Sequence, residues 1–416
     1  MSRDQDPTPE SLARRRLLQA GAALPLAGIP AWASAQQFPT AKVNTTKLAV
    51  TDTEVTVGQL HSGTGTMAIS ETGSIQAEQL AIDQINAMGG VLGRKIKVIK
   101  EDGASDWPTF AEKSKKLLVN DRVACVFGCW TSASRKAVLP IFEKENGMLY
   151  YPTFYEGLEQ SKNVIYTGQE ATQQILYGLD WAAKEKKAKT YFLVGSDYIW
   201  PRTSMKIGRK HIEAHLPAGS KVVGEEYYPL GHTNFNSLIN KIKVAKPDCI
   251  FIAVVGGSNV AFYKQLKAAG VTADKQFMLT EDEVLGIGGE NMTGFYASMK
   301  YFQSLDNPNN KAFVAAFKAK YGKDAVIGDV TQAGYLGPWL WKATVEKAGS
   351  FDVDKNAVAS TGIELKTAPE GYVKLHENHH LWSKARIGQA QADGQFKVVA
   401  ESAALIEPNP FPKGYQ

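Results

Sequence analysis

The stretch that decides the fold runs from residue 55 to residue 100 and reads VTVGQLHSGTGTMAISETGSIQAEQLAIDQINAMGGVLGRKIKVIK. Its ends, Val55–Leu60 and Ile96–Lys100, are short runs with the composition of strands. Between them, over 73–88, apolar residues share one helical face: Ala77, Leu80, Ala81, Ile85 and Met88. Gly89-Gly90 then ends the predicted helix. A strand, a helix and a strand in this order predict a parallel sheet with a right-handed crossover.

The same alternation continues through the chain. The remaining predicted strands are Val123–Phe127, Leu149–Pro152, Val164–Thr167, Thr190–Gly195, Val222–Tyr228, Cys249–Val255, Phe277–Thr280 and Phe295–Tyr301. Together they make ten strands in two runs of five, which predicts two parallel sheets covered by helices. A chain of 416 residues is also longer than one hydrophobic core usually supports, about 250–300 residues. We therefore expect an α/β protein with two lobes.

The first 35 residues have the pattern of an export signal. Arg14–Arg16 is followed by Leu17-Leu18, a weakly apolar stretch over 20–31, and the small-residue sequence Ala33-Ser34-Ala35. This order predicts a signal peptide of the twin-arginine type, cleaved near Ala35. The expected location is the periplasm.

The rest of the composition excludes two classes of partner. Later segments contain no run of 18 apolar residues, which argues against a membrane-spanning helix. The net charge of +5 is small for this length and spread along the chain, so no basic stripe predicts a nucleic-acid partner.

Ligands of open α/β sheets bind beyond the carboxyl ends of the strands, so the loops after the predicted strands form the candidate site. Three of these loops carry both aromatic rings and hydroxyl groups: Trp130, Ser132, Tyr151, Thr153, Tyr155, Tyr198 and Trp200. Rings mixed with hydroxyls predict an aromatic-walled pocket with a few polar groups. A further loop contains Glu281, Asp282 and Glu283, and a carboxylate there could accept hydrogen bonds from ligand N–H groups.

Motifs for catalysis, nucleotides and metals are missing from the sequence. It has no G-x-S-x-G elbow and no H-E-x-x-H motif, so an enzyme is not expected. The loop over 61–67 lacks a nucleotide-binding motif, although its backbone N–H groups could meet a ligand oxygen. His376, His379 and His380 lie in a polar segment, where we expect a surface or hinge role and no metal. No cofactor is predicted.

The three cysteines, Cys125, Cys129 and Cys249, lie in or beside apolar runs. If residues 125–129 are extended, the first two are ~13 Å apart, too far for a disulfide. We expect all three to be buried and unbonded.

Several of these segments resemble one receptor family. The segments are GCWTSASRKAVLP at 128–140, YPTFYEG at 151–157, GSDYIWPRT at 195–203, VVGG at 254–257, YFQSLD at 301–306 and HHLW at 379–382. Together they resemble the urea-binding receptors of ABC importers, which are related to amide and branched-chain amino-acid receptors. The resemblance covers essentially the whole chain after the predicted signal peptide.

The resemblance implies a type I periplasmic-binding-protein fold, with two Rossmann-like lobes and a hinge of three crossovers. The crossovers are expected near Gly168–Thr172, Tyr301–Ser304 and Thr367–Gly371. After the signal peptide (1–35) and a linker (36–53), the N-terminal lobe would contain 54–168 and 303–367. The C-terminal lobe would contain 169–302 and 368–416.

The resemblance also implies roles at the site. Ser132 and Thr153 match positions that hydrogen-bond an amide, and the walls would be Trp130, Tyr151, Tyr198 and Trp200. Glu281 is the candidate acceptor for ligand N–H groups. The implied function is capture of urea, delivery to inner-membrane permease subunits and closure of the lobes on the ligand, by a monomer. Three alternatives remain open: a receptor for short-chain amides or branched-chain amino acids, a cytoplasmic amide sensor, and an amidohydrolase.

Overall fold

The computed structural model describes residues 38–271, 276–277 and 286–415. The predicted signal peptide and Glu281 lie outside the described residues. Residues 38–415 belong to one compact unit. Part of the segment expected as a linker packs onto this unit: Val43, in helix α2 (Thr40–Val43), is buried, and the Arg94 guanidinium donates to the carbonyl oxygen of Phe38 at 2.7 Å.

The first sheet contains five parallel strands in the order β2-β1-β3-β4-β5. Their bounds are β1 (Glu54–His61), β2 (Lys95–Asp102), β3 (Val126–Gly128), β4 (Leu149–Tyr151) and β5 (Val164–Tyr166). Each corresponds to a strand predicted from the sequence. We call this sheet and the helices that cover it the first lobe.

The apolar runs in these strands arise because both faces of the sheet are covered. Side chains alternate between faces along a strand, and around β3 they enter two different cores. Val126 packs in one hydrophobic cluster with Phe142, whereas Cys125 and Phe127 pack in another with Leu340. A parallel sheet buried on both sides requires such continuous runs.

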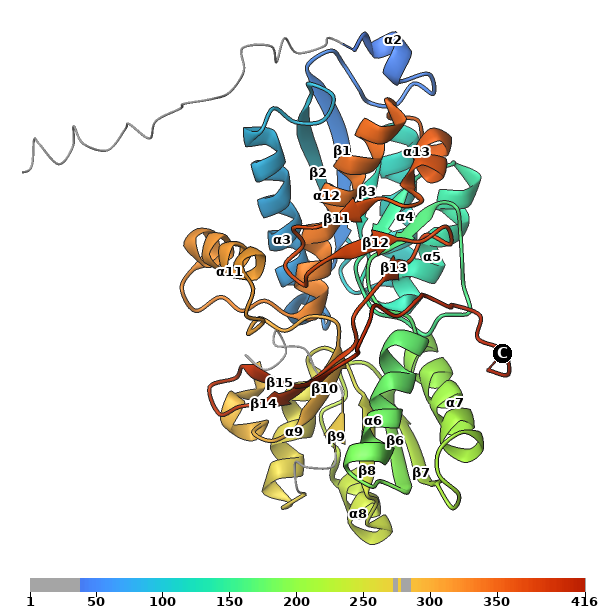
Figure 1. Ribbon diagram of the computed structural model, residues 1–416, viewed down its shortest axis with the longest axis vertical. Coiled ribbons are helices and arrows are strands. Elements are labelled where there is room, and N and C mark those ends of the chain that lie inside the picture. Colours follow the sequence, from blue (N-terminus) through green and yellow to red (C-terminus); the bar gives the residue numbers. More distant parts are fainter. Residues whose placement is uncertain (1–37, 272–275, 278–285, 416) are drawn as a thin grey trace, which may run out of the picture. The chain divides into compact units, whose positions relative to one another are not determined.

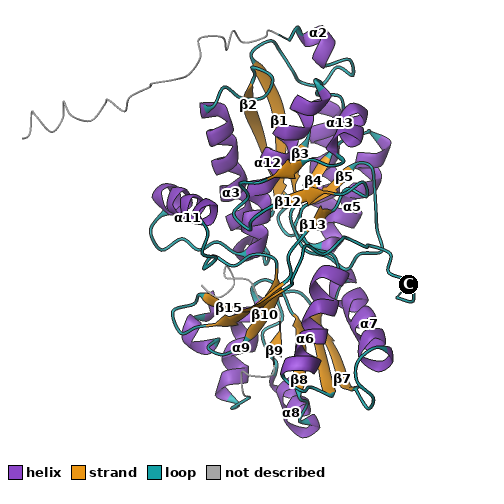
Figure 2. Cartoon of the chain, viewed as in Figure 1, coloured by secondary structure: helices purple, strands orange, loops and turns teal. Residues whose placement is uncertain are grey.

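Helices cover both lobes, as Figure 2 shows. The helices of the first lobe are α3 (Ala68–Ala87), α4 (Trp107–Lys115), η1 (Lys116–Asn120), α5 (Ser132–Lys144), α12 (Asp329–Ala348) and α13 (Val353–Ser360), and α11 (Pro308–Tyr321) packs on α3. The most extensive packing between two helices is that of α3 against α12 (Figure 1). The second lobe contains η2 (Thr172–Leu176), α6 (Tyr177–Glu185), α7 (Ile199–Ala214), α8 (Asn236–Ala245), α9 (Ser258–Ala268) and η4 (Gly289–Asn291).

The second sheet has seven strands in the order β15-β14-β10-β9-β8-β6-β7. Five were predicted and are parallel: β6 (Thr190–Ser196), β7 (Lys221–Tyr228), β8 (Cys249–Ala253), β9 (Gln276–Phe277) and β10 (Tyr296–Met299). Two more come from the C-terminal segment, β14 (Arg386–Ala390) and β15 (Phe396–Glu401), and pair antiparallel beside β10 (Figure 1). The α/β fold of two sheets is confirmed, with an antiparallel edge added.

The third crossover lies later in the chain than expected. Residues 368–382 do not join the second sheet; they contain β12 (Val373–Leu375) and β13 (Leu381–Trp382), which form a small third sheet with β11 (Glu364–Leu365). Val373 and Leu381 pack in the same cluster as Val55 of the first sheet. The chain enters the second sheet only at Arg386, so this segment belongs with the first lobe because its apolar side chains complete that core.

Cys125, Cys129 and Cys249 are buried and not disulfide-bonded. Among the described residues, no helix is long and apolar enough to cross a membrane.

Candidate functional site

The loop after β3 carries the first candidate ring. Gly128 has φ +158°, and a Cβ there would meet the carbonyl oxygen of Leu60 at 2.1 Å, so the turn at the strand end requires glycine. Thr131 then caps α5 by accepting the backbone N–H of Ser134 at 3.0 Å. Between the strand end and the cap lies Trp130, which is 2% exposed.

Aromatic rings from both lobes meet at this point. Trp130 packs edge-on against Phe154, with ring centroids 6.0 Å apart, and Phe154 packs against Trp200 at 5.3 Å. Tyr198 lies 6.5 Å from Trp200. Trp130 and Phe154 follow β3 and β4 of the first sheet, whereas Tyr198 and Trp200 follow β6 of the second. We call these four residues the aromatic cluster; it joins carboxyl ends of strands in both sheets, as expected for an α/β site.

Two indole nitrogens of the cluster, Trp130 Nε1 and Trp200 Nε1, have no hydrogen-bond partner among the described residues, and neither does Oγ1 of Thr153, the residue before Phe154. All three residues are at most 3% exposed. A buried polar group without a partner costs about 1–3 kcal/mol, and native proteins contain few of them. Each of the three can donate a hydrogen bond, so the arrangement suits a ligand that carries an acceptor.

The other two first-lobe candidates, Ser132 and Tyr151, are occupied by internal contacts. The Ser132 hydroxyl donates to Glu156 Oε2 at 2.6 Å and accepts from Arg135 Nη1 at 3.1 Å. The Tyr151 hydroxyl donates to the carbonyl oxygen of Trp130 at 2.7 Å. In these positions Ser132 and Tyr151 hold the loops that present Trp130.

Arg135 is fully buried beneath this site and organises it. Its guanidinium lies 4.7 Å from the ring centroid of Tyr151 and 4.5 Å from that of Tyr155. Its Nε donates to Glu159 at 2.7 Å, and Nη2 pairs with Glu156 at 3.3 Å. The pKa of Glu159 would be raised by burial alone, but Arg135 and Lys136 beside it lower this pKa to about 2. The buried cation is therefore already matched by carboxylates.

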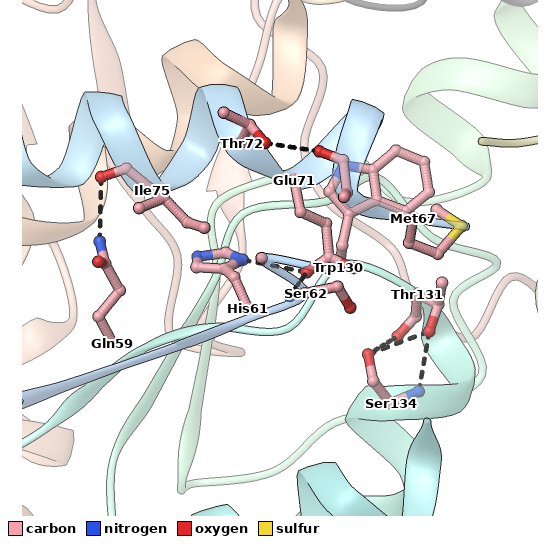
Figure 3. A network of polar contacts seen from close by, with 12 residues as sticks. Gln59, His61, Ser62, Met67, Glu71, Thr72, Ile75, Trp130, Thr131 and Ser134 are labelled. Carbon is pink, nitrogen blue, oxygen red and sulfur yellow. Dashed lines mark hydrogen bonds and ion pairs between the residues drawn. The ribbon is translucent and has the colours of Figure 1, made fainter. Parts of the chain in front are cut away.

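A second buried ionic network stands at the end of β1 (Figure 3). His61 contacts Glu78 through Nε2 at 2.8 Å and Glu71 through Nδ1 at 3.4 Å. Burial alone would lower the pKa of His61, but the charges of Glu78 and Glu71 outweigh it and raise this pKa to about 10. The imidazole is therefore protonated at neutral pH and has two carboxylates around it. Sequence patterning did not identify this network.

In the second lobe, the candidate residues flank the start of α7. Tyr198 precedes the helix with extended backbone angles and is half-buried, and Trp200 is the second helical residue. The Ser196 hydroxyl accepts the backbone N–H of Val255 at 3.1 Å, which joins the loops after β6 and β8. Glu281 would follow β9 but lies outside the described residues.

A match to a protein-family model shows which family the chain belongs to. Residues 55–416 match the family model described as periplasmic binding protein domain. The chain belongs to the periplasmic binding protein family. It is 28% identical to the leucine-, isoleucine-, valine-, threonine- and alanine-binding protein of Pseudomonas aeruginosa, over 77% of this chain and 86% of that one.

Solved structures agree with this family. A solute-binding protein of an ABC transporter from Rhodopseudomonas palustris BisB5, in complex with 3,4-dihydroxybenzoic acid, superposes with a TM-score of 0.77. At 24% identity it covers 85% of this binding protein and 99% of its own chain, which supports the type I fold. A 125-residue stretch is also 36% identical to limonene hydroxylase of Geobacillus stearothermophilus, but spans only 23% of that protein.

The histidines near the C-terminus of this binding protein are buried instead of exposed. His379 is 7% exposed and His380 is fully buried. His380 stacks on Tyr166 with ring centroids 4.2 Å apart, and its Nε2 lies 2.6 Å from the hydroxyl of Tyr155. Within residues 38–271, 276–277 and 286–415, no group of three or more His, Cys, Asp or Glu side chains could hold a metal ion.

Proposed function

We propose that this periplasmic solute-binding protein of ABC transporters captures urea at the aromatic cluster and delivers it to inner-membrane permease subunits. The observation that carries the proposal is the set of buried donors without partners among the described residues: Trp130 Nε1, Thr153 Oγ1 and Trp200 Nε1. Urea is small, flat and uncharged, and its carbonyl oxygen accepts hydrogen bonds. Aromatic faces suit a flat solute and exclude water from its hydrogen bonds.

The charges around the cluster support a neutral ligand. An amino acid carries a carboxylate and an ammonium group, and each needs an opposite charge when it is buried. Arg135 is paired with Glu156 and Glu159, and His61 with Glu71 and Glu78. Neither buried cation is free to bind a ligand carboxylate.

The individual roles follow from the chemistry of each group. Thr153 and the two indole N–H groups would donate to the carbonyl oxygen of urea, while Tyr198 and the rings of the cluster would bound its plane. Ser132 and Tyr151 would support these groups through Glu156 and the Trp130 carbonyl. Glu281 remains a candidate acceptor for the N–H groups of urea.

A rival ligand class is favoured by one observation. Helices α5 and α7 begin at Ser132 and Ile199, beside the cluster, and helix N-termini attract negative charge. A carboxylate such as a branched-chain amino acid or an aromatic acid would use this field. Short-chain amides would use the same donors as urea.

Isothermal titration calorimetry on the purified protein separates these ligands. We expect urea to bind more tightly than acetamide, and both to bind more tightly than leucine or 3,4-dihydroxybenzoate. Binding of leucine or the benzoate without measurable binding of urea or acetamide would rule the proposal out. Release of ammonia during incubation with urea would instead indicate an amidohydrolase.

The place of action is tested separately. The export signal predicted over 1–35, with cleavage near Ala35, would place the mature protein in the periplasm as a monomer. Osmotic-shock fractionation should recover it in the periplasmic fraction, and mass spectrometry should give a mature N-terminus near Gln36. Retention of the uncleaved chain in the cytoplasm would favour an intracellular amide sensor.

A further inference from the structure

The carboxylate of Glu71, beside the aromatic cluster, uses only one of its two oxygens in contacts with the described residues. Glu71 lies in the first turn of α3 and is fully buried. Its Oε2 accepts the backbone N–H of Ser62 at 2.7 Å and faces His61 Nδ1 at 3.4 Å. Its other oxygen, Oε1, has no hydrogen-bond partner among the described residues. A buried carboxylate oxygen without a donor is costly, so a ligand N–H group that reached Oε1 would relieve this cost.

The position of Glu71 relative to Trp130 follows from the strand register. Ser62, which binds Glu71, comes directly after β1, and Trp130 comes two residues after β3. These strands are neighbours, and the N–H of Cys129 donates to the carbonyl oxygen of Leu60 at 2.8 Å. Adjacent strands lie about 4.8 Å apart. The negative charge of Glu71 reaches this loop as well: after burial, it is the next cause that raises the pKa of the Cys129 thiol.

Two buried polar atoms without hydrogen-bond partners among the described residues, one a donor and one an acceptor, therefore lie at the ends of neighbouring strands. Trp130 Nε1 is a donor and Glu71 Oε1 is an acceptor, and Figure 3 draws both side chains in the same network. A primary amide offers a carbonyl oxygen to the donor and an N–H group to the acceptor. A carboxylate of the same shape offers two acceptors, one of which would face Glu71.

We propose that Glu71 is the specificity-determining carboxylate that accepts the N–H groups of the ligand and excludes solutes carrying a carboxylate. This inference rests on the proposed function and deepens it. Glu71 and Glu78 share the imidazolium of His61, but only Glu71 has an oxygen, Oε1, without a partner among the described residues. At hydrogen-bond distance this oxygen repels a ligand carboxylate and attracts the polarised N–H groups of an amide.

Glu78 provides a matched control. It contacts the same imidazole at 2.8 Å, but its second oxygen accepts from the Gln59 side chain at 2.7 Å. Both of its oxygens are therefore used inside the protein. Glu78→Gln removes a carboxylate from the His61 network without removing an unmatched acceptor. An effect that passes only through His61 should appear in both variants.

The test compares urea, acetamide and acetate by calorimetry in the wild type, Glu71→Gln and Glu78→Gln. Acetamide and acetate have the same shape and differ in charge. We expect the wild type to bind acetamide at least 10-fold more tightly than acetate. Glu71→Gln should weaken the binding of urea and of acetamide about 10- to 100-fold, as for a lost hydrogen bond to a charged group. It should also reduce the ratio of the affinity for acetamide to the affinity for acetate. Glu78→Gln should leave that ratio unchanged within about 2-fold, even if thermal unfolding shows a loss of stability.

Three outcomes would overturn the inference. If the wild type binds acetate as tightly as acetamide, Glu71 does not exclude carboxylates; this result requires no variant to fold. If both variants change the ratio equally, Glu71 acts only through His61. In both cases urea binding by the wild type would leave the proposed function standing. If the wild type binds neither urea nor acetamide, the proposed function and the role of Glu71 fall together.

Discussion

The backbone N–H of Gly257 donates to the carbonyl oxygen of Thr66 at 3.2 Å. This hydrogen bond joins the loop after β8, in the second sheet, to the loop after β1, in the first. The preceding residue, Gly256, has φ +66°, and a Cβ there would lie 2.8 Å from the Thr66 oxygen and 2.9 Å from the sulfur of Met67. The two loops therefore approach one another only because residue 256 has no side chain.

Gly256→Ala should weaken ligand binding by opposing this approach. The added methyl group collides with a backbone atom of the other loop, so the conformation in which the lobes touch becomes less populated. Affinity falls in proportion to the population of the binding-competent state. We expect the Kd for urea to rise about 10-fold, together with a larger radius of gyration by small-angle X-ray scattering in the presence of urea.

Gly270→Ala is the control for this variant. Gly270 also has a left-handed backbone, with φ +68°, but a Cβ there meets nothing within 4 Å. Both substitutions carry the same kind of backbone strain, and only one adds a contact between the lobes. Equal affinity losses in the two variants would mean that strain, not the contact between loops, explains the result.

Thr153→Ala and Ser132→Ala should separate binding from stability. Thr153 Oγ1 has no partner among the described residues, so its loss should weaken urea binding by about 1 kcal/mol with little change in unfolding free energy. Ser132 bonds Glu156 and Arg135. Its removal should lower the free energy of unfolding by about 1–3 kcal/mol, because it leaves buried charged groups without a partner. Because urea is the proposed ligand, it cannot serve as the denaturant. Unfolding is therefore measured in guanidinium chloride, and binding by calorimetry.

The opposite results would change which of Ser132 and Thr153 is placed in contact with the ligand. If Ser132→Ala lowers affinity and leaves unfolding unchanged, the Ser132 hydroxyl contacts the ligand directly, as the family resemblance implies. If Thr153→Ala changes neither quantity, Thr153 is not part of the site.

Burial on both faces explains why several of the strands could be predicted, whereas β2 and β7 are partly exposed and were predicted from their strand-forming residues. Val123–Phe127 reads as an unbroken apolar run because its side chains enter two separate cores. The loops after such strands could then be located, and with them Trp130, Thr153 and Trp200. This logic predicts which loops meet, because parallel strands present their carboxyl ends at one edge.

Other features depend on partners far away in the chain. In β15 exposed residues alternate with buried or half-buried ones, and β14 contains the polar residues Arg386 and Gln389. β14 becomes a strand by pairing with β10, and β15 by pairing with β14. Helix α3 begins at Ala68, five residues before the predicted start at residue 73, so Glu71 was not expected in a helix facing His61. The unmatched oxygen of Glu71 arises from tertiary contacts that no local pattern contains.

Acidification should destabilise the protein through His380. Burial lowers the pKa of His380 to about 3, whereas an unfolded histidine has a pKa of about 6.5. Between these values the unfolded chain binds one more proton than the folded protein, so this contribution to stability falls as the pH drops from 6.5 towards 3 and is constant above 6.5. The expected slope is up to about 1.4 kcal/mol per pH unit.

Guanidinium unfolding between pH 4 and pH 8 measures this slope. His380→Gln should reduce the slope below pH 6.5, since glutamine does not titrate. His215→Gln removes an exposed histidine and should leave the slope as in the wild type. A wild-type slope that persists in His380→Gln would assign the acid sensitivity to other groups.

Trp200→Phe should isolate the contribution of one N–H group to binding. The substitution keeps an aromatic ring against Phe154 and removes Nε1, which has no partner among the described residues. We expect the Kd for urea to rise about 3- to 10-fold, the value of one neutral hydrogen bond. Stability without ligand should stay equal or rise, because a buried donor without a partner is removed. Trp341→Phe alters a core indole in α12 that packs on Phe127 and should leave the Kd unchanged. If the Kd is also unchanged in Trp200→Phe, that N–H group does not meet the ligand, and the donor set behind the urea proposal loses one of its three members.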